Sequence, residues 1–480
     1  MSLIEHLQEY ASIKTVSLIL ILVWFVSVCL ARIYEDRRIK QLGHRATTLS
    51  SYLPWGIDIV FLLSHANIKR NLLQFWQKKL LFNLTVFTTE TRLFNQRILF
   101  TADQENIKAI LAAQFQDFGK GPSMHERWRD FLGDGIFTTD GQQWHDSRQL
   151  IRPQFTRDRL GDLHCFESHL QTLLKTIANG GPLEGEGQVV DLKAANGKVL
   201  DISDLFFRYT LDITTEFLMG SDVKSLSTLK QDFAEAFNTV QHLQIIYGLM
   251  SKAHKLMPKK EYYAGIKVMD NFMNRFIQLA LRLSPEELAL RTKSDKGYTF
   301  LHGLASFTRD PKLIRDQIIA VLLAGRDTTA STLSWAIYEL ARHPEAVTRL
   351  RKEILETVGH DGLPTYEHLK NMPYLKAILN ETLRLYPSIP MNVRVALKDT
   401  TLPRGGGPDG TQPIGLLKGT LIFYSTLAMQ RRKDIYPPSR THSPTPTSSA
   451  QRGGPTGTRS RTTTSLSTQD RASASDSSLP

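Results

Sequence analysis

The longest apolar run with recognisable helix ends lies between Asp310 and Pro344. Asp310 can cap a helix that begins at Pro311, and the residue before Pro344 is a natural stop. About 33 residues of α-helix would extend for roughly 50 Å. The centre, residues 318–324, is apolar on nearly every face, so the pattern predicts a helix buried inside a large domain.

A polar group interrupts this helix at its centre. Gly325, Asp327, Thr328 and Thr329 follow the apolar run. The glycine costs about 1 kcal/mol relative to alanine in a helix interior, and the hydroxyls can bond to carbonyls one turn earlier. Two interpretations stay open: the helix is weakened where a ligand approaches its backbone, or it is a core helix whose hydroxyls bond to its own carbonyls.

A second motif lies downstream, where Glu381 and Arg384 are three residues apart and so share one face of a predicted helix. Alone, such a pair is typical of a solvated surface bridge. In this order and at this separation, however, residues 324–329 and 381–384 closely resemble the central and K helices of the cytochrome P450 monooxygenases.

The resemblance extends over residues 100–437, and several segments look like the fungal subgroup that hydroxylates alkanes and fatty acids. These segments are residues 101–111, 133–137, 152–155, 215–218 and 405–410. Short β-branched and aromatic runs at residues 81–100 predict a hairpin, and Asp103 can cap a helix after it. The expected fold is mainly α with small β-sheets. It is a cytochrome P450-like fold, truncated at its C-terminal end and preceded by an N-terminal membrane anchor.

The resemblance implies a haem and the residues around it. Trp144 and Arg148 share a helix face and match the helix that grips a haem propionate; alone, the pair would be interpreted as a cation–π or packing contact. Arg394, in a predicted strand, matches the arginine that reaches the second propionate, and a solvated edge-strand arginine is the alternative. Ala324 and Gly325 would lie against the cofactor.

The resemblance also implies a mechanism. Haem iron held by a cysteine thiolate activates O₂, and an NADPH–cytochrome P450 reductase supplies the electrons. Asp327 and Thr328 would relay protons to the distal oxygen, while Glu381 and Arg384 would be structural. Apolar positions at helical spacing in residues 233–249 predict either part of an apolar substrate pocket or ordinary core. They are Phe233, Phe237, Val240, Leu243, Ile246 and Tyr247.

Residues 15–33 are the candidate membrane span, near the short limit for crossing a bilayer. No basic region precedes them, as a cleaved signal peptide would require, whereas Arg32, Arg37, Arg38 and Lys40 follow at once. The positive-inside rule places that side in the cytoplasm. We therefore expect residues 1–40 to be a single-pass signal anchor in the endoplasmic reticulum membrane, and residues 41–437 to be the cytosolic catalytic domain.

Composition adds two limits. With 480 residues, of which 41% are hydrophobic, the chain can bury a large core. Its net charge of +12 is not arranged as a basic stripe with interleaved aromatics, so we expect no nucleic-acid partner. A membrane surface or an acidic redox partner accounts better for the charge.

The chain has two cysteines, which excludes a disulfide framework and marks the main departure from the family. The family's haem ligand lies in a Phe-x-x-Gly-x-Arg-x-Cys-x-Gly loop well after Arg384. Here the cysteines are Cys29, in the anchor, and Cys165, which we interpret as a buried structural thiol in a helix. The sequence assigns no metal-ligating residue. Two hypotheses follow: an enzyme whose C-terminal sequence is corrupted, and a catalytically dead, membrane-anchored remnant.

Residues 438–480 change abruptly to Ser, Thr, Pro, Arg and Gly, a composition typical of disorder. The genetic code offers a more specific explanation. Synonymous codons for residues 465–480, read two bases later, encode Pro-Phe-Asn-Ala-Gly-Pro-Arg-Ile-Cys-Leu-Gly, which contains the missing haem loop. We therefore expect a frame-shifted tail that arose from a retained intron fragment or a misplaced exon boundary.

Overall fold

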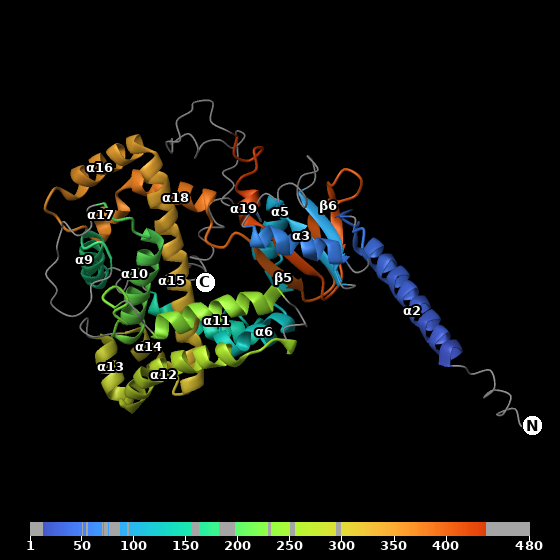
Figure 1. The fold of residues 1–480 in the computed structure, drawn as a ribbon, viewed down its shortest axis with the longest axis horizontal. Coiled ribbons are helices and arrows are strands. Elements are labelled where there is room, and N and C mark those ends of the chain that lie inside the picture. The colour runs from blue at the N-terminus through green and yellow to red at the C-terminus, as the bar shows by residue number, and fades with distance from the viewer. Residues whose placement is uncertain are drawn as a thin grey trace, which may run out of the picture. The chain divides into compact units, whose positions relative to one another are not determined.

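The computed structural model describes residues 13–49, 51–53, 56–69, 71, 75, 87–93, 96–155, 163–181, 197–228, 232–249, 255–293 and 299–437. The chain divides into two units. The first comprises Met1–Gly119 and Val393–Ser425, and the second comprises Lys120–Asn392 and Thr426–Pro480. The described elements are mostly helices with two small sheets (Figure 1), which confirms the predicted fold class. The predicted tail, residues 438–480, lies outside the described residues.

The first unit holds the strands and a few helices. Its elements are α2 (Ile13–Leu42), β1 (Thr47–Thr48), α3 (Ile57–Ile68), β2 (Thr88–Leu93), β3 (Gln96–Thr101), α5 (Gln104–Lys108), η3 (Ala109–Ala113), η4 (Phe115–Asp117), β4 (Phe118–Gly119), β5 (Asn392–Ala396), β6 (Thr400–Gly406), β7 (Gln412–Leu416) and β8 (Leu421–Tyr424).

The second unit is helical. Its elements are α6 (Pro122–Leu132), α7 (Gly141–Ile151), η5 (Arg152–Gln154), α9 (His164–Ala178), α10 (Ile202–Met219), α11 (Asp232–Leu249), α12 (Lys260–Arg282), α13 (Pro285–Lys293), α14 (Phe300–Phe307), α15 (Pro311–Arg342), α16 (Pro344–Val358), α17 (Tyr366–Lys370), α18 (Pro373–Leu385) and α19 (Thr426–Met429).

The larger sheet has the strand order β1-β2-β3-β8-β5-β4. The predicted second strand is confirmed by β3, which pairs antiparallel with β2. Strand β2, Thr88–Leu93, follows the expected first strand at residues 82–87, of which residues 82–86 lie outside the described residues. Strand β3 then pairs in parallel with β8, which comes from far along the chain. After β3 the carboxylate of Asp103 accepts the backbone N–H groups of Glu105 and Asn106, so the predicted helix cap is also confirmed.

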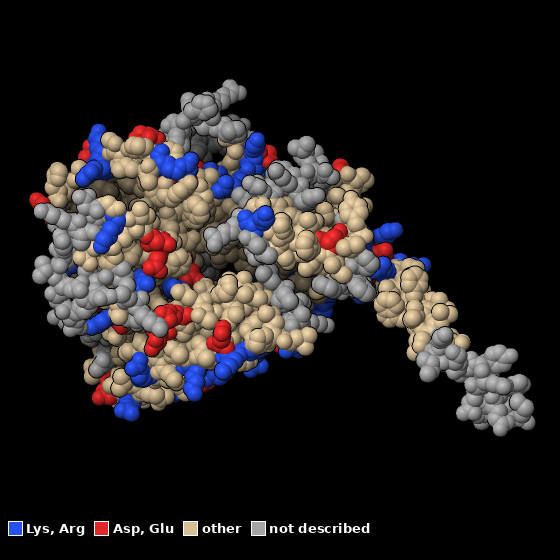
Figure 2. All heavy atoms as spheres, viewed as in Figure 1, with Lys and Arg blue, Asp and Glu red and all other residues tan. Residues whose placement is uncertain are grey.

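Helix α2 has two parts with different surroundings. Residues 15–42 are long and apolar enough to cross a membrane, and the side chains from Leu18 to Val26 are exposed. Figure 2 shows this part of the helix without charged side chains until its C-terminal end. That end belongs to the first unit, because Ile39 is fully buried and Glu35 accepts a hydrogen bond of 2.7 Å from Arg92. The predicted anchor boundary at residue 40 therefore cuts through a segment that packs onto the first unit.

Helix α15 forms the axis of the helical unit and has the predicted limits. The Asp310 carboxylate accepts the N–H of Lys312, Pro311 occupies the first turn, and the helix ends at Arg342. Figure 1 shows α12–α14 near its N-terminal end and α16–α18 near its C-terminal end. Ile318, Ile319 and Leu322 are fully buried, as their apolar run predicts. Burial of this central run contributes to the main hydrophobic core of the unit.

The apolar positions of α11 belong largely to the core. Phe233 lies 4.7 Å from the ring of Phe272, Val240 faces Gly265 of α12, and Phe237 is fully buried. Tyr247 donates a hydrogen bond of 2.9 Å to the carbonyl of Pro258. Of the two interpretations of this segment, ordinary core describes these four side chains, whereas Leu243 and Ile246 are only partly buried.

Candidate functional site

The polar segment of α15 is held by side chains from α10 and α11. Arg326 is 4% exposed, its Nη2 donates to Oδ1 of Asn238 at 2.7 Å, and its guanidinium lies over the rings of Phe207 and Phe237. Its Nε has no hydrogen-bond partner among the residues that the structure describes. Burial lowers the pKa of Arg326, and the nearby Asp327 carboxylate opposes the shift.

Asp327 lies beside this arginine and is bound on the other side by α11. The Nε2 of Gln241 donates to its carboxylate, and Nη1 of Arg326 donates at 3.2 Å. Burial raises the pKa of Asp327, whereas Arg326 and Gln241 act in the opposite direction. Burial therefore favours a protonated Asp327, whereas its two donors favour the carboxylate, and a group balanced in this way can both take up and release a proton at this point of the helix.

Gly325 marks a close approach between two helices. A Cβ atom at this position would lie 3.2 Å from both Cγ2 and Oγ1 of Thr214, so a side chain here would press on α10. Helix packing alone therefore explains the glycine. Its predicted contact with a cofactor, and that of Ala324, remain proposals.

Thr328 bonds to its own helix. Its hydroxyl donates to the carbonyl of Ala324 at 2.6 Å, as the second interpretation of this segment described. The carbonyl of Thr328 in turn accepts the hydroxyls of Thr332 at 2.8 Å and of Ser388 at 3.3 Å. Helix carbonyls of this segment thus accept hydroxyl groups, and one of these hydroxyls reaches α15 from the segment after α18.

Glu381 and Arg384 form the predicted pair on α18. Nε and Nη2 of Arg384 donate to the two carboxylate oxygens of Glu381 at 2.8 and 2.6 Å. Nη1 donates to the carbonyl of Gln430 at 2.9 Å, and the guanidinium lies 5.0 Å from the ring centre of Tyr436. Both side chains are partly exposed, at 33% and 22%. The pair therefore joins α18 to the segment after α19, a structural task like the one expected.

Trp144 and Arg148 meet on α7, and a second cation joins them. The guanidinium of Arg148 lies 5.5 Å from the ring centre of Trp144, and Nζ of Lys120 lies 5.9 Å from it. The Asp140 carboxylate positions Lys120 by accepting its backbone N–H at 2.8 Å. Sequence reasoning missed Lys120, because the 24 positions that separate it from Trp144 give no helical periodicity to detect.

These motifs gather along α15. The Nε2 of Gln317 lies 3.3 Å from Oγ of Ser147, which precedes Arg148 on α7. Thr332 Oγ1 lies 3.3 Å from Oγ of Ser388, beyond the C-terminal end of α18. Arg394 belongs to the first unit, where its Nη1 donates to the carbonyl of Val393 at 2.9 Å and its guanidinium faces Tyr424.

Neither cysteine belongs to the polar segment of α15. Cys29 is on α2, and Cys165 is on α9 in a group with Glu216 of α10. Glu216 follows Thr214 by two positions, or about 200° around α10, so this group lies on the side of α10 away from Gly325. The described residues offer cations and the polar segment of α15 but no thiolate beside α15, so they do not complete a haem site.

Comparisons with known proteins agree with the motifs. Residues 72–445 match the family described as Cytochrome P450. The chain is 53% identical over 409 residues to "Cytochrome P450 monooxygenase pvhE" of Talaromyces variabilis, a match that covers 85% of this chain and 76% of that protein. It is 43% identical over 367 residues to "Cytochrome P450 52A12" of Debaryomyces hansenii, covering 73% of this chain and 67% of the relative. It is 44% identical over 357 residues to "Cytochrome P450 52A6" of Candida tropicalis, a match that covers 71% of this chain and 65% of that protein.

Proposed function

Because this chain belongs to the cytochrome P450 family of monooxygenases, we propose that it hydroxylates long-chain alkanes or fatty acids at a membrane, with haem as its cofactor. The match over residues 72–445 carries the proposal. The substrate class rests on the resemblance of residues 100–437 to the fungal subgroup and on the similarity to relatives of the 52A group.

The proposal gives each predicted residue a role. Trp144 and Arg148, with Lys120 beside them, would bind one haem propionate, and Arg394 would bind the other. Asp327 and Thr328 would hold and pass protons beside Ala324 and Gly325. Haem, when bound, would supply the oxygen-activating iron. No thiolate lies beside α15 in the part of the chain that the structure describes.

The partners and location follow the same proposal. An NADPH–cytochrome P450 reductase would deliver electrons, and the excess positive charge of the chain suits an acidic partner surface. The apolar helix α2 supports a single-pass anchor, with the catalytic domain on the cytosolic side of the endoplasmic reticulum membrane.

A second function is favoured by one observation, the positions of Cys29 and Cys165. A chain without a thiolate ligand would be a catalytically dead, membrane-anchored remnant. The alternative is a frame-shifted tail, in which case the active protein would contain a haem-ligating cysteine that the present reading frame does not encode. The family match ends at residue 445, eight residues into residues 438–480.

Carbon monoxide difference spectra of the purified full chain separate the two functions. A thiolate-ligated haem gives a characteristic Soret band, and we expect this band in protein made from the native transcript. Turnover with an alkane and a fatty acid of matched chain length, in the presence of the reductase, then tests the substrate class. If the verified transcript encodes the present sequence and the purified chain binds no haem, the protein is the remnant instead. If the shifted reading frame of the transcript contains no cysteine codon, the shifted tail is excluded.

A further inference from the structure

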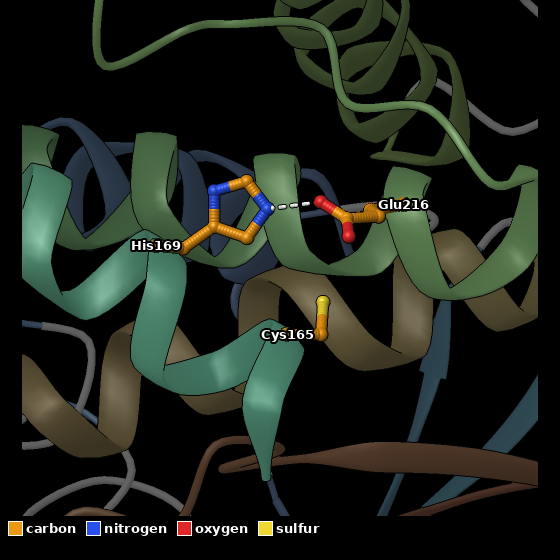
Figure 3. A group of neighbouring side chains, drawn as sticks. All are labelled: Cys165, His169 and Glu216. Carbon is orange, nitrogen blue, oxygen red and sulfur yellow. Dashed lines mark hydrogen bonds and ion pairs between the residues drawn. The ribbon is translucent and has the colours of Figure 1, made fainter. Parts of the chain in front are cut away.

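Three potential metal ligands meet between α9 and α10. Cys165 and His169 are four residues apart, so they lie on the same face of α9, and Glu216 comes from α10. One ligand atom from each lies within 4.8 Å of the other two. Figure 3 shows the imidazole and the carboxylate pointing toward one another, with the cysteine sulfur below them. The Nε2 of His169 lies 2.7 Å from Oε2 of Glu216.

The surroundings of His169 are unusually acidic. Its side chain is 7% exposed, and it also forms a group with Asp212 and Asp222 in which the ligand atoms lie within 4.8 Å of one another. Asp212 is held in place, because its carboxylate accepts the backbone N–H groups of Ser225 at 2.7 Å and Leu226 at 3.0 Å. Three carboxylates and a thiol therefore surround one buried imidazole.

We propose that Cys165, His169 and Glu216 bind a divalent transition-metal ion of the zinc type. Sulfur, imidazole nitrogen and carboxylate oxygen are the ligands that zinc takes in proteins, whereas magnesium and calcium prefer oxygen alone. Three protein ligands leave a fourth position for water. The site is open to the ion, because the Glu216 side chain is 41% exposed.

The geometry requires a small adjustment. Zinc bonds of about 2.0–2.3 Å in a tetrahedron place ligand atoms roughly 3.3–3.8 Å apart. Separations near the 4.8 Å limit must therefore shorten by about 1 Å, while His169 Nε2 and Glu216 Oε2, now 2.7 Å apart, must move apart by at least about 0.6 Å. Rotations of the Cys165 and Glu216 side chains can supply both changes.

Proton balance follows from the ligand chemistry. The thiol loses one proton to solvent when sulfur binds the ion, and the proton on Nε2 of His169 must leave or move to Nδ1. Asp212 and Asp222 each have a carboxylate oxygen within 4.8 Å of a His169 ring nitrogen, and carboxylates commonly accept the second N–H of metal-bound histidines. The bound ion would clamp the first turns of α9 to α10.

The test uses the full chain, purified in detergent and freed of metal. Zinc chloride is titrated by calorimetry, and zinc K-edge absorption identifies the neighbours of the bound ion. We expect one zinc per chain, with one sulfur neighbour and the remaining neighbours nitrogen or oxygen. Absence of zinc binding, or a bound zinc without sulfur, would overturn the proposal.

Variants locate the site. Cys165→Ser and Glu216→Gln should each raise the zinc Kd by at least about tenfold. The matched controls Cys29→Ser and His145→Gln remove the other cysteine and an exposed histidine, and should leave the Kd unchanged. Circular dichroism checks that each variant is folded. If a variant unfolds, the zinc absorption spectra still decide. A sulfur neighbour that is present in the unaltered chain and kept in Cys29→Ser supports this site, whereas no sulfur neighbour would leave only an ion pair of His169 with Glu216.

Discussion

Arg326 shows how one buried charge organises its neighbours. It is 4% exposed and lies between two aromatic rings, and among the residues that the structure describes its hydrogen-bond acceptors are Asn238 and Asp327. Removing either partner would leave a buried charge partly unsatisfied, which is among the costlier changes in a protein interior. The raised pKa of Asp327 is the counterpart of this arrangement, since burial disfavours its charged form too.

Titration of Asp327 should contribute to the pH dependence of the free energy of unfolding. Burial raises the pKa of Asp327 above the usual 3.8. Between the pKa of Asp327 in the unfolded chain and its higher pKa in the folded chain, the folded chain therefore binds more protons. The free energy of unfolding should therefore fall as pH rises through this window. Asp327→Asn should make that slope flatter, as measured by denaturant unfolding at several pH values between about 4 and 7.

Asp409→Asn serves as the control for this measurement. Hydrogen bonds from Thr411 lower the pKa of Asp409, so its titration lies below the same window. The control should keep the slope of the unaltered chain above pH 4. An identical slope in Asp327→Asn and the unaltered chain would contradict the assignment.

Arg384→Lys should destabilise the helical unit by about 1–2 kcal/mol. Lysine cannot reproduce the two parallel bonds to Glu381 or reach the carbonyl of Gln430 at the same time. Partial exposure of the pair keeps the expected loss modest. Thermal unfolding measures it, with Arg342→Lys, a change at an exposed arginine, expected within about 0.5 kcal/mol of the unaltered chain. Equal losses in the two variants would remove the special role of Arg384.

At the scale of elements, α15 and α10 are fitted to each other at Gly325 and Thr214. A methyl group on Gly325 would stand 3.2 Å from Thr214, closer than side chains normally approach. The local gain in helix propensity from alanine, about 1 kcal/mol, is therefore opposed by overpacking. The two helices can separate at this point only by breaking contacts elsewhere along α15.

A double-mutant cycle tests this fit. Gly325→Ala should be more favourable by at least about 0.5 kcal/mol in a Thr214→Ala background than in the unaltered chain, because the smaller partner makes room for the new methyl group. Denaturant midpoints of the four proteins supply the cycle. Additive effects would show that the helices do not press on each other here.

The limits of α15 could be predicted from the sequence, since the Asp310 cap and Pro344 are local signals. The same holds for Glu381 with Arg384, which are three residues apart. The partners of the polar segment could not be predicted. Asn238 and Arg326 are 88 positions apart, and Gln241 and Asp327 are 86 apart, so only the packing of α11 onto α15 joins them. Helical periodicity reports which face is apolar, not which neighbour lies against it.

At the scale of the whole molecule, α2 combines a candidate membrane span with a docked end. Its exposed apolar stretch is long enough to cross a membrane, whereas Ile39 and the ion pairs of Glu35 with Arg92 and of Arg38 with Asp399 tie its last turns to the first unit. An anchor removed at residue 40 would therefore also remove contacts that the first unit needs.

Removal of residues 1–33 should release the chain from membranes and leave its stability unchanged. Removal of residues 1–42 should also release it but lower its unfolding temperature, because Ile39 and two ion pairs are lost. Alkaline extraction of membranes, followed by thermal unfolding, measures both effects. Integral association of the shorter deletion would show that α2 is not the anchor, and equal stability of the two deletions would show that its last turns are not docked.

The parallel pairing of β3 with β8 also has a consequence for synthesis on the ribosome. Ile98 of β3 pairs with Leu421 of β8, which lies 323 positions later in the chain. At about 5–20 residues per second, roughly 15–60 s pass between translation of the two segments. Throughout that interval the nascent chain carries an unfinished sheet edge, while the preceding α2 is already available to the membrane. Chaperones that shield open strand edges close to the bilayer should therefore govern its yield.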